Sequence, residues 1–483
     1  MLTSIKVGSD EATIDPPLVV DLDGTLLRSD ILLETAFSYV AARPDRIFKL
    51  VLALTKGKAA LKAHIASDTP IDVASLPYDE RVLDIIIEAK KSGRSVHLVS
   101  ASNERYVRAI AEHLALFDGW MGSTDKTNLS SSDKAASLVA AFGKGNFDYI
   151  GNDRADLAVW SVARQKIIVN PAAGVRSELI SIDRNARILE PIGGKLRRWA
   201  KLLRVHQWAK NGLVFVPLVT AHRFAPVAFG QEIVAFLAFS LVASSIYVLN
   251  DIVDVEADRK HPSKKRRPLA AGTVSIKQAF AVAPAIALLG LGAAVALSPW
   301  LAATLLVYLA MTTAYTFFLK RKMMIDIITL ASLFTLRVGA GAVAISVPVS
   351  EWLLAFSMFI FTSLALTKRY IELAARIDGD LPDPTNRNYR KSDLGIVAAL
   401  AAAAGFNAVT ILALYISSEA VRGLYRTPSL LWLICPILMY WLGRLLLMAQ
   451  RRLIDDDPIA FALRDWNSLL ALTLVGIILA LAT

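Results

Sequence analysis

Two acidic residues, separated by one position, follow a short apolar run near the start of the chain. The run at 17–20 leads into Asp21 and Asp23, and Gly24 and Thr25 come directly after. At the carboxyl end of a parallel strand, one such carboxylate can attack a phosphoryl group while the other moves a proton and helps to hold Mg²⁺. Gly24 allows a tight turn, and Thr25 can offer a hydroxyl group to phosphate oxygens. An ordinary turn is the alternative, because Asp and Gly are common in turns.

Two further residues are candidates for binding the same phosphate. Ser100 follows the apolar run at 95–99, so its hydroxyl group is expected at the same edge of a sheet. Lys134 lies on an expected helix, where its charge could neutralise a phosphorylated aspartate. A solvated surface lysine is the alternative interpretation of Lys134, and Lys126 is a competing candidate for the role.

A second acidic turn follows the apolar run at 147–150. It contains Asp153 and Asp156, whose carboxylates are suited to Mg²⁺. Together with Asp21 and Asp23, these residues form the predicted metal site of the N-terminal part.

The elements that must position these residues alternate along the first 190 residues. Candidate strands are followed by longer amphipathic or polar stretches, which predicts an α/β domain with a parallel sheet. A helical stretch at 31–90 interrupts this alternation and is expected to be an inserted cap. The strands are expected at 17–20, 95–99, 147–150 and 166–169. We therefore expect a first domain at 1–190 and a second at 191–483.

In this order, the four polar segments resemble the haloacid dehalogenase superfamily of aspartate-nucleophile phosphatases, over about residues 17–175. The resemblance implies that Asp21 is the nucleophile and Asp23 the acid/base. It also implies that Ser100 binds phosphate, that Lys134 stabilises it, and that the last acidic motif holds Mg²⁺.

The sequence departs from the family at one position. The family usually has an acid directly after the glycine of the last motif, where this chain has Asn152, followed by Asp153. Either residue completes the metal site, or the site is weakened. A soluble domain that regulates without turnover is therefore an alternative to a phosphatase.

The composition of the whole chain indicates a membrane protein. It has 483 residues, of which 55% are hydrophobic, and a formal net charge of +11, with a mean hydropathy of +0.47. These values argue against disorder and against a wholly soluble fold. The single cysteine excludes an intrachain disulfide and a cysteine-based metal site. The first apolar run is too short for a secretory signal.

Apolar windows long enough to cross a bilayer recur after residue 204, and they predict an all-α bundle of nine transmembrane helices. The expected spans are 204–221, 229–250, 276–298, 299–319, 325–346, 351–371, 393–417, 428–449 and 465–482. Lys and Arg gather in the loops after the second, fourth, sixth and eighth spans, which predicts that this side is cytoplasmic. The N-terminal domain would lie on the same side of the cytoplasmic membrane, and the C-terminus outside. The net charge then needs no nucleic acid to explain it.

The second expected span ends in a cluster of acidic residues. Asn250, Asp251, Asp254 and Asp258 recur at helical spacing. Acids near membrane depth repel one another unless a cation joins them, so Mg²⁺ bridging a diphosphate is the simplest explanation.

Basic and polar residues near the other cytoplasmic helix ends are expected to bind phosphate groups, although a positive-inside loop is the better interpretation for any single lysine. Arg337 lies within an apolar run, which normally requires a buried anionic partner or ligand. The candidates are Lys210, Asn211, Lys264, Arg266, Arg267, Tyr315, Lys320, Asp326, Arg337, Lys368 and Arg369.

Over about residues 196–483, the acidic motif and the basic loops resemble the UbiA superfamily of intramembrane prenyltransferases, and most closely its decaprenyl-phosphate phosphoribosyltransferase branch. Further residues that carry this likeness are 207–211, 258–262, 267–268, 315–320, 364–369, 457–458 and 464–465. Asp326 stands alone where aromatic prenyltransferases of the superfamily usually show a second acidic pair.

The resemblance implies a bifunctional, Mg²⁺-dependent enzyme of cell-envelope biosynthesis. It would transfer a 5-phosphoribosyl group from phosphoribosyl diphosphate to polyprenyl phosphate, with Asp251 and Asp254 at the reacting diphosphate. The N-terminal domain would then remove the ribose 5-phosphate. An aromatic prenyltransferase that uses a polyprenyl diphosphate is the alternative, and an oligomer is compatible with the sequence.

Overall fold

The chain forms two compact units. A computed structural model describes residues 15–43, 46–125, 127–171, 174–191, 193–261, 263–384, 387–454 and 457–483. The first unit comprises Met1–Val205 and Tyr247–Ala283, and the second comprises His206–Ile246 and Pro284–Thr483. The acidic motif at 250–258 therefore packs with the N-terminal part of the chain. The boundary between two domains that the sequence suggests near residue 190 stays a prediction. Lys126 lies outside the described residues.

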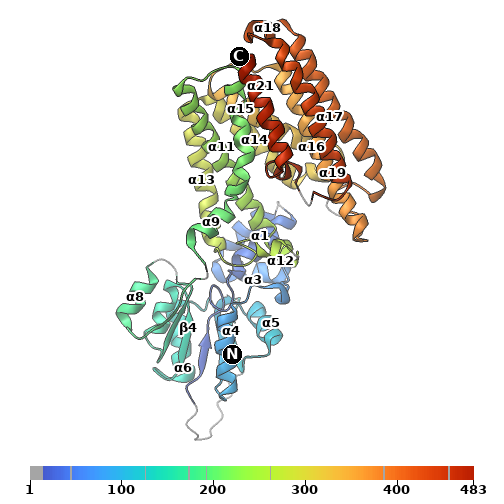
Figure 1. Ribbon diagram of the computed structural model, residues 1–483. Coiled ribbons are helices and arrows are strands. Elements are labelled where there is room, and N and C mark those ends of the chain that lie inside the picture. Colours follow the sequence, from blue (N-terminus) through green and yellow to red (C-terminus); the bar gives the residue numbers. More distant parts are fainter. Residues whose placement is uncertain are drawn as a thin grey trace. The chain divides into compact units, whose positions relative to one another are not determined.

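A six-stranded parallel sheet is the centre of the first unit (Figure 1). The four predicted strands are confirmed, and the two additional strands lie at the two edges of the sheet, whose order is β3-β2-β1-β4-β5-β6. The central strand β1 pairs with β2 and β4, so the residues that follow β1, β2 and β4 meet at one edge. The strands are β1 (Leu18–Val20), β2 (Val96–Asn103), β3 (Gly119–Ser123), β4 (Asp148–Gly151), β5 (Lys166–Val169) and β6 (Arg187–Leu189).

Helices cover both faces of this sheet, as the crossover connections of a parallel sheet require. On one face, α4 (Glu80–Lys91) and α5 (Glu104–Leu114) pack against Leu18 and Val96. On the other, α6 (Ser131–Phe142), α7 (Leu157–Trp160) and α8 (Val175–Ile182) pack against Val19 and Tyr149.

The helical insertion after β1 contains α1 (Ile31–Ala42), α2 (Ile47–Thr55) and α3 (Lys58–Asp68). The expected cap extended to residue 90 and so included α4. However, Val82 and Ile86 of α4 are fully buried in the same cluster as β1 and β2, which makes α4 a crossover helix of the sheet. Only α1–α3 and the short turn that follows them form the insertion.

A segment with the ends of two long helices completes the first unit. It contains the end of α11 (Pro226–Val253), then α12 (Val255–Lys260), and the start of α13 (Ile276–Leu297). Leu33 and Phe37 of α1 pack into an apolar cluster with Val248, Ile252 and residues of α9 (Lys195–Leu202). The insertion is thus fixed to the helix ends that carry the acidic motif.

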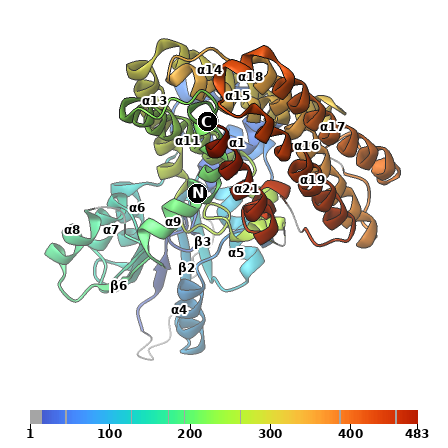
Figure 2. The same cartoon turned by 45° about the horizontal axis from the view of Figure 1, so that its top comes forward.

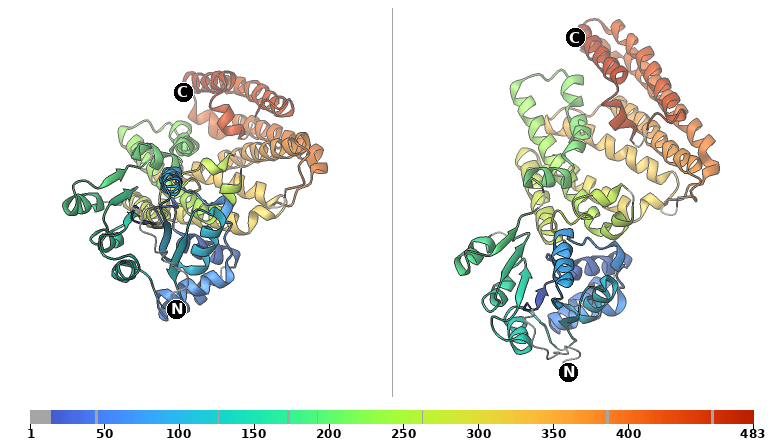
Figure 3. Two further views of the ribbon diagram at one scale, coloured as in Figure 1. Left: turned by 90° about the horizontal axis from the view of Figure 1, so that it is seen from below. Right: turned by 60° about the horizontal axis from the view of Figure 1, so that its bottom comes forward.

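The second unit is helical, and seven helices in the described part of the chain are long and apolar enough to cross a membrane. Helices α16 and α17 pack along one another, and α19 packs on both (Figures 2 and 3). The seven are α11, α13, α14 (Pro299–Phe317), α15 (Ile325–Ala344), α16 (Glu351–Asp378), Lys391–Ser417, which contains α17 (Leu394–Ser417), and Pro428–Gln450, which contains α19 (Ile434–Gln450). Shorter helices are α18 (Glu419–Leu424), α20 (Pro458–Ala462) and the apolar α21 (Trp466–Ala482).

The expected span at 204–221 is not one continuous α-helix. It consists of a 3₁₀ helix at Val205–Phe215 followed by α10 (Val216–Thr220). Pro217 lacks a backbone donor and stands at the start of α10, where that donor would be unpaired in any case. A 3₁₀ helix of this length is unusual and often marks a functional or strained stretch.

Candidate functional site

Asp21 lies directly after β1, as the sequence predicts, and is almost fully buried. The Lys134 ammonium group donates to Asp21 Oδ1 at 2.6 Å, and the Thr25 hydroxyl group donates to Oδ2 at 3.2 Å. Burial raises the pKa of Asp21 to about 7, against the charge of Lys134, and the charges of Asp156 and Asp23 raise it further. Lys134, and not a surface lysine, is therefore the cation at this carboxylate.

Asp23 lies at the same edge of the sheet, two residues after Asp21. Its Oδ1 accepts from the backbone N–H of Ile31 at 2.8 Å, and its Oδ2 accepts from the hydroxyl groups of Ser102 at 2.5 Å and Ser100 at 3.3 Å. Burial raises the pKa of Asp23 to about 6, and the charge of Asp30 adds to this effect. A carboxyl group in this range can give and take a proton near neutral pH.

The second acidic turn positions Lys134 through Asp156. Asp156 Oδ1 accepts from the Tyr149 hydroxyl group at 2.6 Å, and Lys134 lies 3.4 Å from the same oxygen. Its Oδ2 accepts from the backbone N–H groups of Asn152 and Asp153 at 2.9 and 3.1 Å. Because both oxygens are engaged, Asp156 orders the turn and the lysine. Asp153 instead caps the short helix that follows, through the N–H of Arg154.

The residues at this edge fit a magnesium ion. Asp21 and Asp156 are buried and share Lys134, whereas Asp23 is partly buried and accepts from neutral donors. Among the described residues, the three carboxyl groups thus have one bonded cation between them. Asn152 lies against Gly24, whose φ is +79°, and a Cβ there would stand 2.0 Å from its amide nitrogen. In the described residues, no three acids, histidines or cysteines converge into a metal cluster of their own. Mg²⁺ normally takes only one or two carboxylates and completes its shell with water and phosphate oxygens.

Tyr149 and Ser102 are functional residues that the sequence reasoning missed. Tyr149 bonds both Lys134 and Asp156, and Ser102 makes the shorter of the two hydroxyl bonds to Asp23. The only signal for Ser102 was its place two residues after Ser100 on the same side of β2, which the two-residue period of a strand could have indicated.

A second acidic cluster lies where α11 ends and α12 begins. Asp251 and Asp258 are both buried, and the Arg267 guanidinium group bonds them together, at 3.1 and 2.7 Å. Arg204 also lies 2.5 Å from Asp251 and stacks on the Tyr247 ring. Two of the four predicted residues, Asp251 and Asp258, thus lie in one cluster, although the helical spacing paired each of them with Asp254.

The other members of the predicted motif are placed differently. Asp254 is exposed at the break between α11 and α12, and Asn250 is half-buried one turn before it. Lys264 and Arg266 are exposed, so among the three predicted cations of this loop Arg267 is the one bonded to the acids. Oxygen ligands beside a guanidinium fork suit a magnesium diphosphate.

In the second unit, the protein partners of the buried Arg337 that the described residues show are neutral, and an anionic ligand at Arg337 stays a prediction. It donates to the Asn211 amide oxygen at 2.9 Å and to the Tyr308 hydroxyl group at 3.2 Å. Its guanidinium group also lies over the rings of Phe239, Tyr308 and Phe334. Hydrogen bonds and aromatic faces together compensate for the buried charge.

Asp326 is part of a separate buried network. It accepts from Arg369 at 2.9 Å and from the Tyr389 hydroxyl group at 2.7 Å, and both Asp326 and Arg369 are fully buried. Tyr315 lies beside Arg369, and Lys320 lies in the turn Leu319–Arg321.

Lys210 and Lys368 share one carboxylate, Asp457. The distances from the two ammonium groups are 2.5 and 3.7 Å. Lys210 also lines a cavity of about 1100 Å³ whose other lining residues are mostly apolar, such as Phe334, Trp352 and Leu364. The volume lies just above the usual range for small-molecule sites, which is about 300–1,000 Å³. An apolar cavity with charged groups at its wall suits an amphiphile with a long hydrocarbon chain and an anionic head.

The profile of the UbiA prenyltransferase family matches residues 215–469. An uncharacterized protein of Sinorhizobium fredii is 35% identical over 94% of this chain and 88% of its own length. The decaprenyl-phosphate phosphoribosyltransferase of Mycolicibacterium smegmatis is 40% identical, over 40% of this chain and 60% of that enzyme.

Two solved structures are similar to separate parts of the chain. A UbiA homolog from Archaeoglobus fulgidus, bound to GPP and Mg²⁺, covers 59% of this chain and 96% of its own, with 17% identity and a TM-score of 0.44. A haloacid dehalogenase family hydrolase from Salmonella enterica covers 34% of this chain and 66% of its own, with 15% identity and a TM-score of 0.27. The chemistry of the site at Asp21 therefore rests on its geometry.

Proposed function

The chain belongs to the UbiA prenyltransferase family, and on that premise we propose that it transfers a 5-phosphoribosyl group from phosphoribosyl diphosphate to a polyprenyl phosphate. The family and the seven apolar helices make it a membrane enzyme. The likeness to decaprenyl-phosphate phosphoribosyltransferases supports the choice of substrates.

One observation carries this proposal: Asp251 and Asp258 are held together by Arg267 at the end of a long apolar helix. Charged residues buried at the end of a membrane helix are rare, pair with one another as these do, and commonly mark a substrate or ion site. Mg²⁺ held by the oxygens of Asp251 and Asp258 would neutralise charge on a departing diphosphate. Arg267 and Arg204 can donate to the oxygens of that diphosphate and stabilise its charge as the bond breaks.

The reaction itself needs little from a general base. An oxygen of the lipid phosphate forms a bond to C1 of the ribose, and the bond from C1 to the diphosphate oxygen breaks, with its electron pair leaving on diphosphate. The acceptor is already an anion, so no proton must be removed first. The cavity beside Lys210 is the candidate site for the lipid chain, and Lys210 and Lys368 are candidates for its phosphate.

We propose further that the site at Asp21 removes the ribose 5-phosphate from the product. Asp21 attacks the phosphorus atom, the P–O bond to the ribose breaks, and Asp23 gives its proton to the departing oxygen. Water, deprotonated by Asp23, then hydrolyses the aspartyl phosphate. Lys134 and Thr25 are placed to stabilise charge on the transferring group.

The transferase is tested with the full-length protein in lipid, with Mg²⁺, polyprenyl phosphate and radiolabelled phosphoribosyl diphosphate. We expect label to enter the organic phase, and to be lost in Asp251→Asn. If the protein instead transfers label from a labelled polyprenyl diphosphate to a hydroxybenzoate in a parallel assay, the enzyme is an aromatic prenyltransferase and the proposal is wrong.

The phosphatase is tested in the same assay with Asp21→Asn. This variant should accumulate a lipid that still carries the 5-phosphate, whereas the unaltered chain should release inorganic phosphate. If Asp21→Asn gives the dephosphorylated lipid at the unaltered rate, the phosphatase proposal fails. Failure to trap an aspartyl phosphate in the unaltered chain would favour a regulatory domain instead.

A further inference from the structure

Two lysines approach the Asp23 side of the proposed phosphatase site from segments far apart in the sequence. Lys62 lies on α3 of the insertion, and Lys277 lies in the first turn of α13. Neither belongs to the machinery described above, which acts on a single phosphate group through Asp21, Lys134 and Thr25.

Lys62 is anchored to the strand that carries the phosphate-binding serines. Its ammonium group donates to the Ala101 carbonyl oxygen at 2.5 Å and to the Asn128 side-chain oxygen at 2.7 Å. Ala101 stands between Ser100 and Ser102, the two residues whose hydroxyl groups bond Asp23. An ammonium group has three donors, so Lys62 can offer one more hydrogen bond.

Lys277 approaches Asp23 from a different helix, α13. Its ammonium group lies 2.8 Å from the Asp30 carboxylate, and the next residue, Ile31, donates its N–H to Asp23. Its side chain is 59% exposed, and it lies within electrostatic reach of both Asp23 and Asp153. A partly exposed pair with Asp30 is weak enough to be exchanged for a phosphate.

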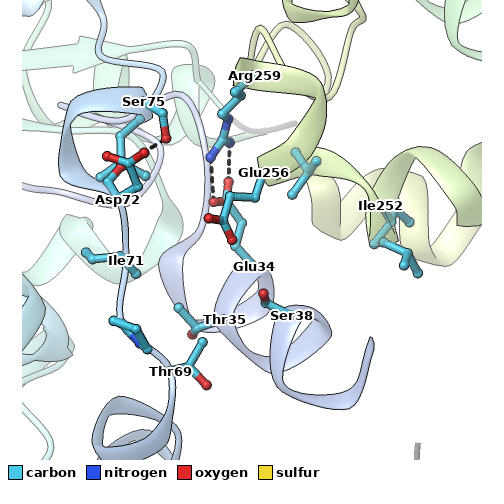
Figure 4. Close-up of a pocket in the computed structure, with 14 residues that line it drawn as sticks. Glu34, Thr35, Ser38, Thr69, Ile71, Asp72, Ser75, Ile252, Glu256 and Arg259 are labelled. Atoms are coloured by element: carbon cyan, nitrogen blue, oxygen red, sulfur yellow. Dashed lines mark hydrogen bonds and ion pairs between the residues drawn. The ribbon is translucent and has the colours of Figure 1, made fainter. Parts of the chain in front are cut away.

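Contacts between the insertion and the acidic segment hold Lys277 in this place. Figure 4 shows Glu34 of α1 and Arg259 of α12 pointing toward one another, with an ion pair between them. Lys260 lies 3.1 Å from Asp72. At Gly272, which has a φ of +65°, a Cβ would stand 2.4 Å from the side chain of Arg28, so the two backbones approach closely.

We propose that Lys62 and Lys277 form a second anion subsite at the mouth of the phosphatase site. It binds the phosphodiester of a lipid-linked phosphosugar while the terminal phosphomonoester reaches Asp21. This inference rests on the proposed phosphatase function and deepens it. Because Lys277 belongs to the first turn of an apolar helix long enough to span a membrane, a phosphate bound there lies at the start of a membrane segment, where a lipid headgroup would be.

The test compares KM values of the full-length protein in detergent for three substrates. These are ribose 5-phosphate, ribose 1,5-bisphosphate and farnesyl-phosphoryl ribose 5-phosphate. In the unaltered chain, we expect the two substrates with a second phosphate to have the lower KM, and the lipid-linked one the lowest. In Lys277→Ala, the advantage of the lipid-linked substrate over ribose 5-phosphate should fall about tenfold, which is the loss expected for one charge-assisted hydrogen bond.

Two further variants separate ligand binding from a structural role. Asp30→Asn keeps a side chain that can cap α1 but frees Lys277, so the KM for the lipid-linked substrate should fall. If the pair of Asp30 and Lys277 is merely structural, Asp30→Asn should instead reduce activity on all three substrates. Lys277→Arg should restore most of the advantage, and Lys91→Ala, at an exposed lysine of α4, is the matched control.

Several outcomes would overturn the subsite. If Lys277→Ala changes all three KM values equally, or changes none, Lys277 binds no second phosphate. If it affects the bisphosphate alone, the ligand is a soluble sugar phosphate and the lipid assignment is wrong. If the unaltered chain has no phosphatase activity on any of the three substrates, the proposed phosphatase function itself is refuted, and not only the subsite.

Discussion

Lys134 is a buried cation that touches two carboxylates, Asp21 and Asp156, and its own position depends on the hydroxyl group of Tyr149. In Lys134→Met, the transferring phosphoryl group loses a preorganised charge. We therefore expect kcat for p-nitrophenyl phosphate to fall about 100-fold, with a much smaller change in KM. Steady-state kinetics of the full-length protein measure this.

The matched control for Lys134 is Lys144→Met, at an exposed lysine close in the sequence. This variant should retain the kcat of the unaltered chain. Equal kcat values for Lys134→Met and the unaltered chain would show that the buried lysine only fills space beneath Asp21.

Arg267 is the residue that makes Asp251 and Asp258 one cluster. In Arg267→Gln, both carboxylates lose a cation that competes with Mg²⁺. The Kd for Mg²⁺ should therefore fall about fivefold, which corresponds to about 1 kcal/mol of binding free energy. At the same time the transferase kcat should fall about 100-fold, because a donor to the leaving diphosphate is gone. Calorimetric titration with Mg²⁺ alone measures the first effect, and Lys265→Gln is the control. Weaker Mg²⁺ binding in Arg267→Gln would contradict this role.

At the scale of elements, the strands were predictable because short β-branched runs ending in polar residues have few other interpretations. That pattern located β1, β2, β4 and β5, and with them Asp21 and Ser100. It could not assign α4, since an amphipathic helix shows that it has a buried face but not which surface covers it. The ion pair between Lys210 and Asp457 could not be predicted either. The two residues are 247 positions apart in the sequence, and only the packing of the helices brings them together.

Asp79 is the N-cap residue of α4 and ties this helix to the end of β5 through Asn170. Asp79 is fully buried, caps α4, and accepts from Arg81, Arg28 and Asn170. Burial alone would raise the pKa of Asp79, but these hydrogen bonds hold it well below its usual value. The stability that this provides is present above the unfolded pKa, near 3.9, and is lost as the pH falls below it.

Asp79→Asn should therefore destabilise the sheet by about 2 kcal/mol at pH 7, after allowance for the partial exposure of both arginines. The difference from the unaltered chain should shrink at pH 3.5. Calorimetry of the full-length protein in detergent measures both values. Asp84→Asn, at an exposed position of the same helix, should change neither. A difference that grows toward acid pH would mean that the Asp79 carboxylate is not the stabilising form.

At the scale of the whole molecule, the orientation of the chain depends on the segment at 205–220, which no hydropathy pattern could identify as 3₁₀. A 3₁₀ helix rises about 2.0 Å per residue, against about 1.5 Å for an α-helix, so Val205–Phe215 and α10 together rise about 30 Å. This matches the hydrocarbon core of a bilayer. The stretched helix can thus serve as the first span with fewer residues than an α-helix needs.

If both this segment and α21 cross the membrane, the N-terminal part lies in the cytoplasm and Thr483 lies outside. Single cysteines introduced into a Cys435→Ser background test this with a membrane-impermeant maleimide on intact cells. Ser298→Cys, between α13 and α14, and Thr483→Cys should react, whereas Ser263→Cys should react only after lysis. Reaction at Ser298 without reaction at Thr483 would show that α21 does not span, and reaction at Ser263 alone would invert the topology. Only the second result would place the acidic motif and the phosphatase site on the side opposite to the one that the lysine-rich loops predict.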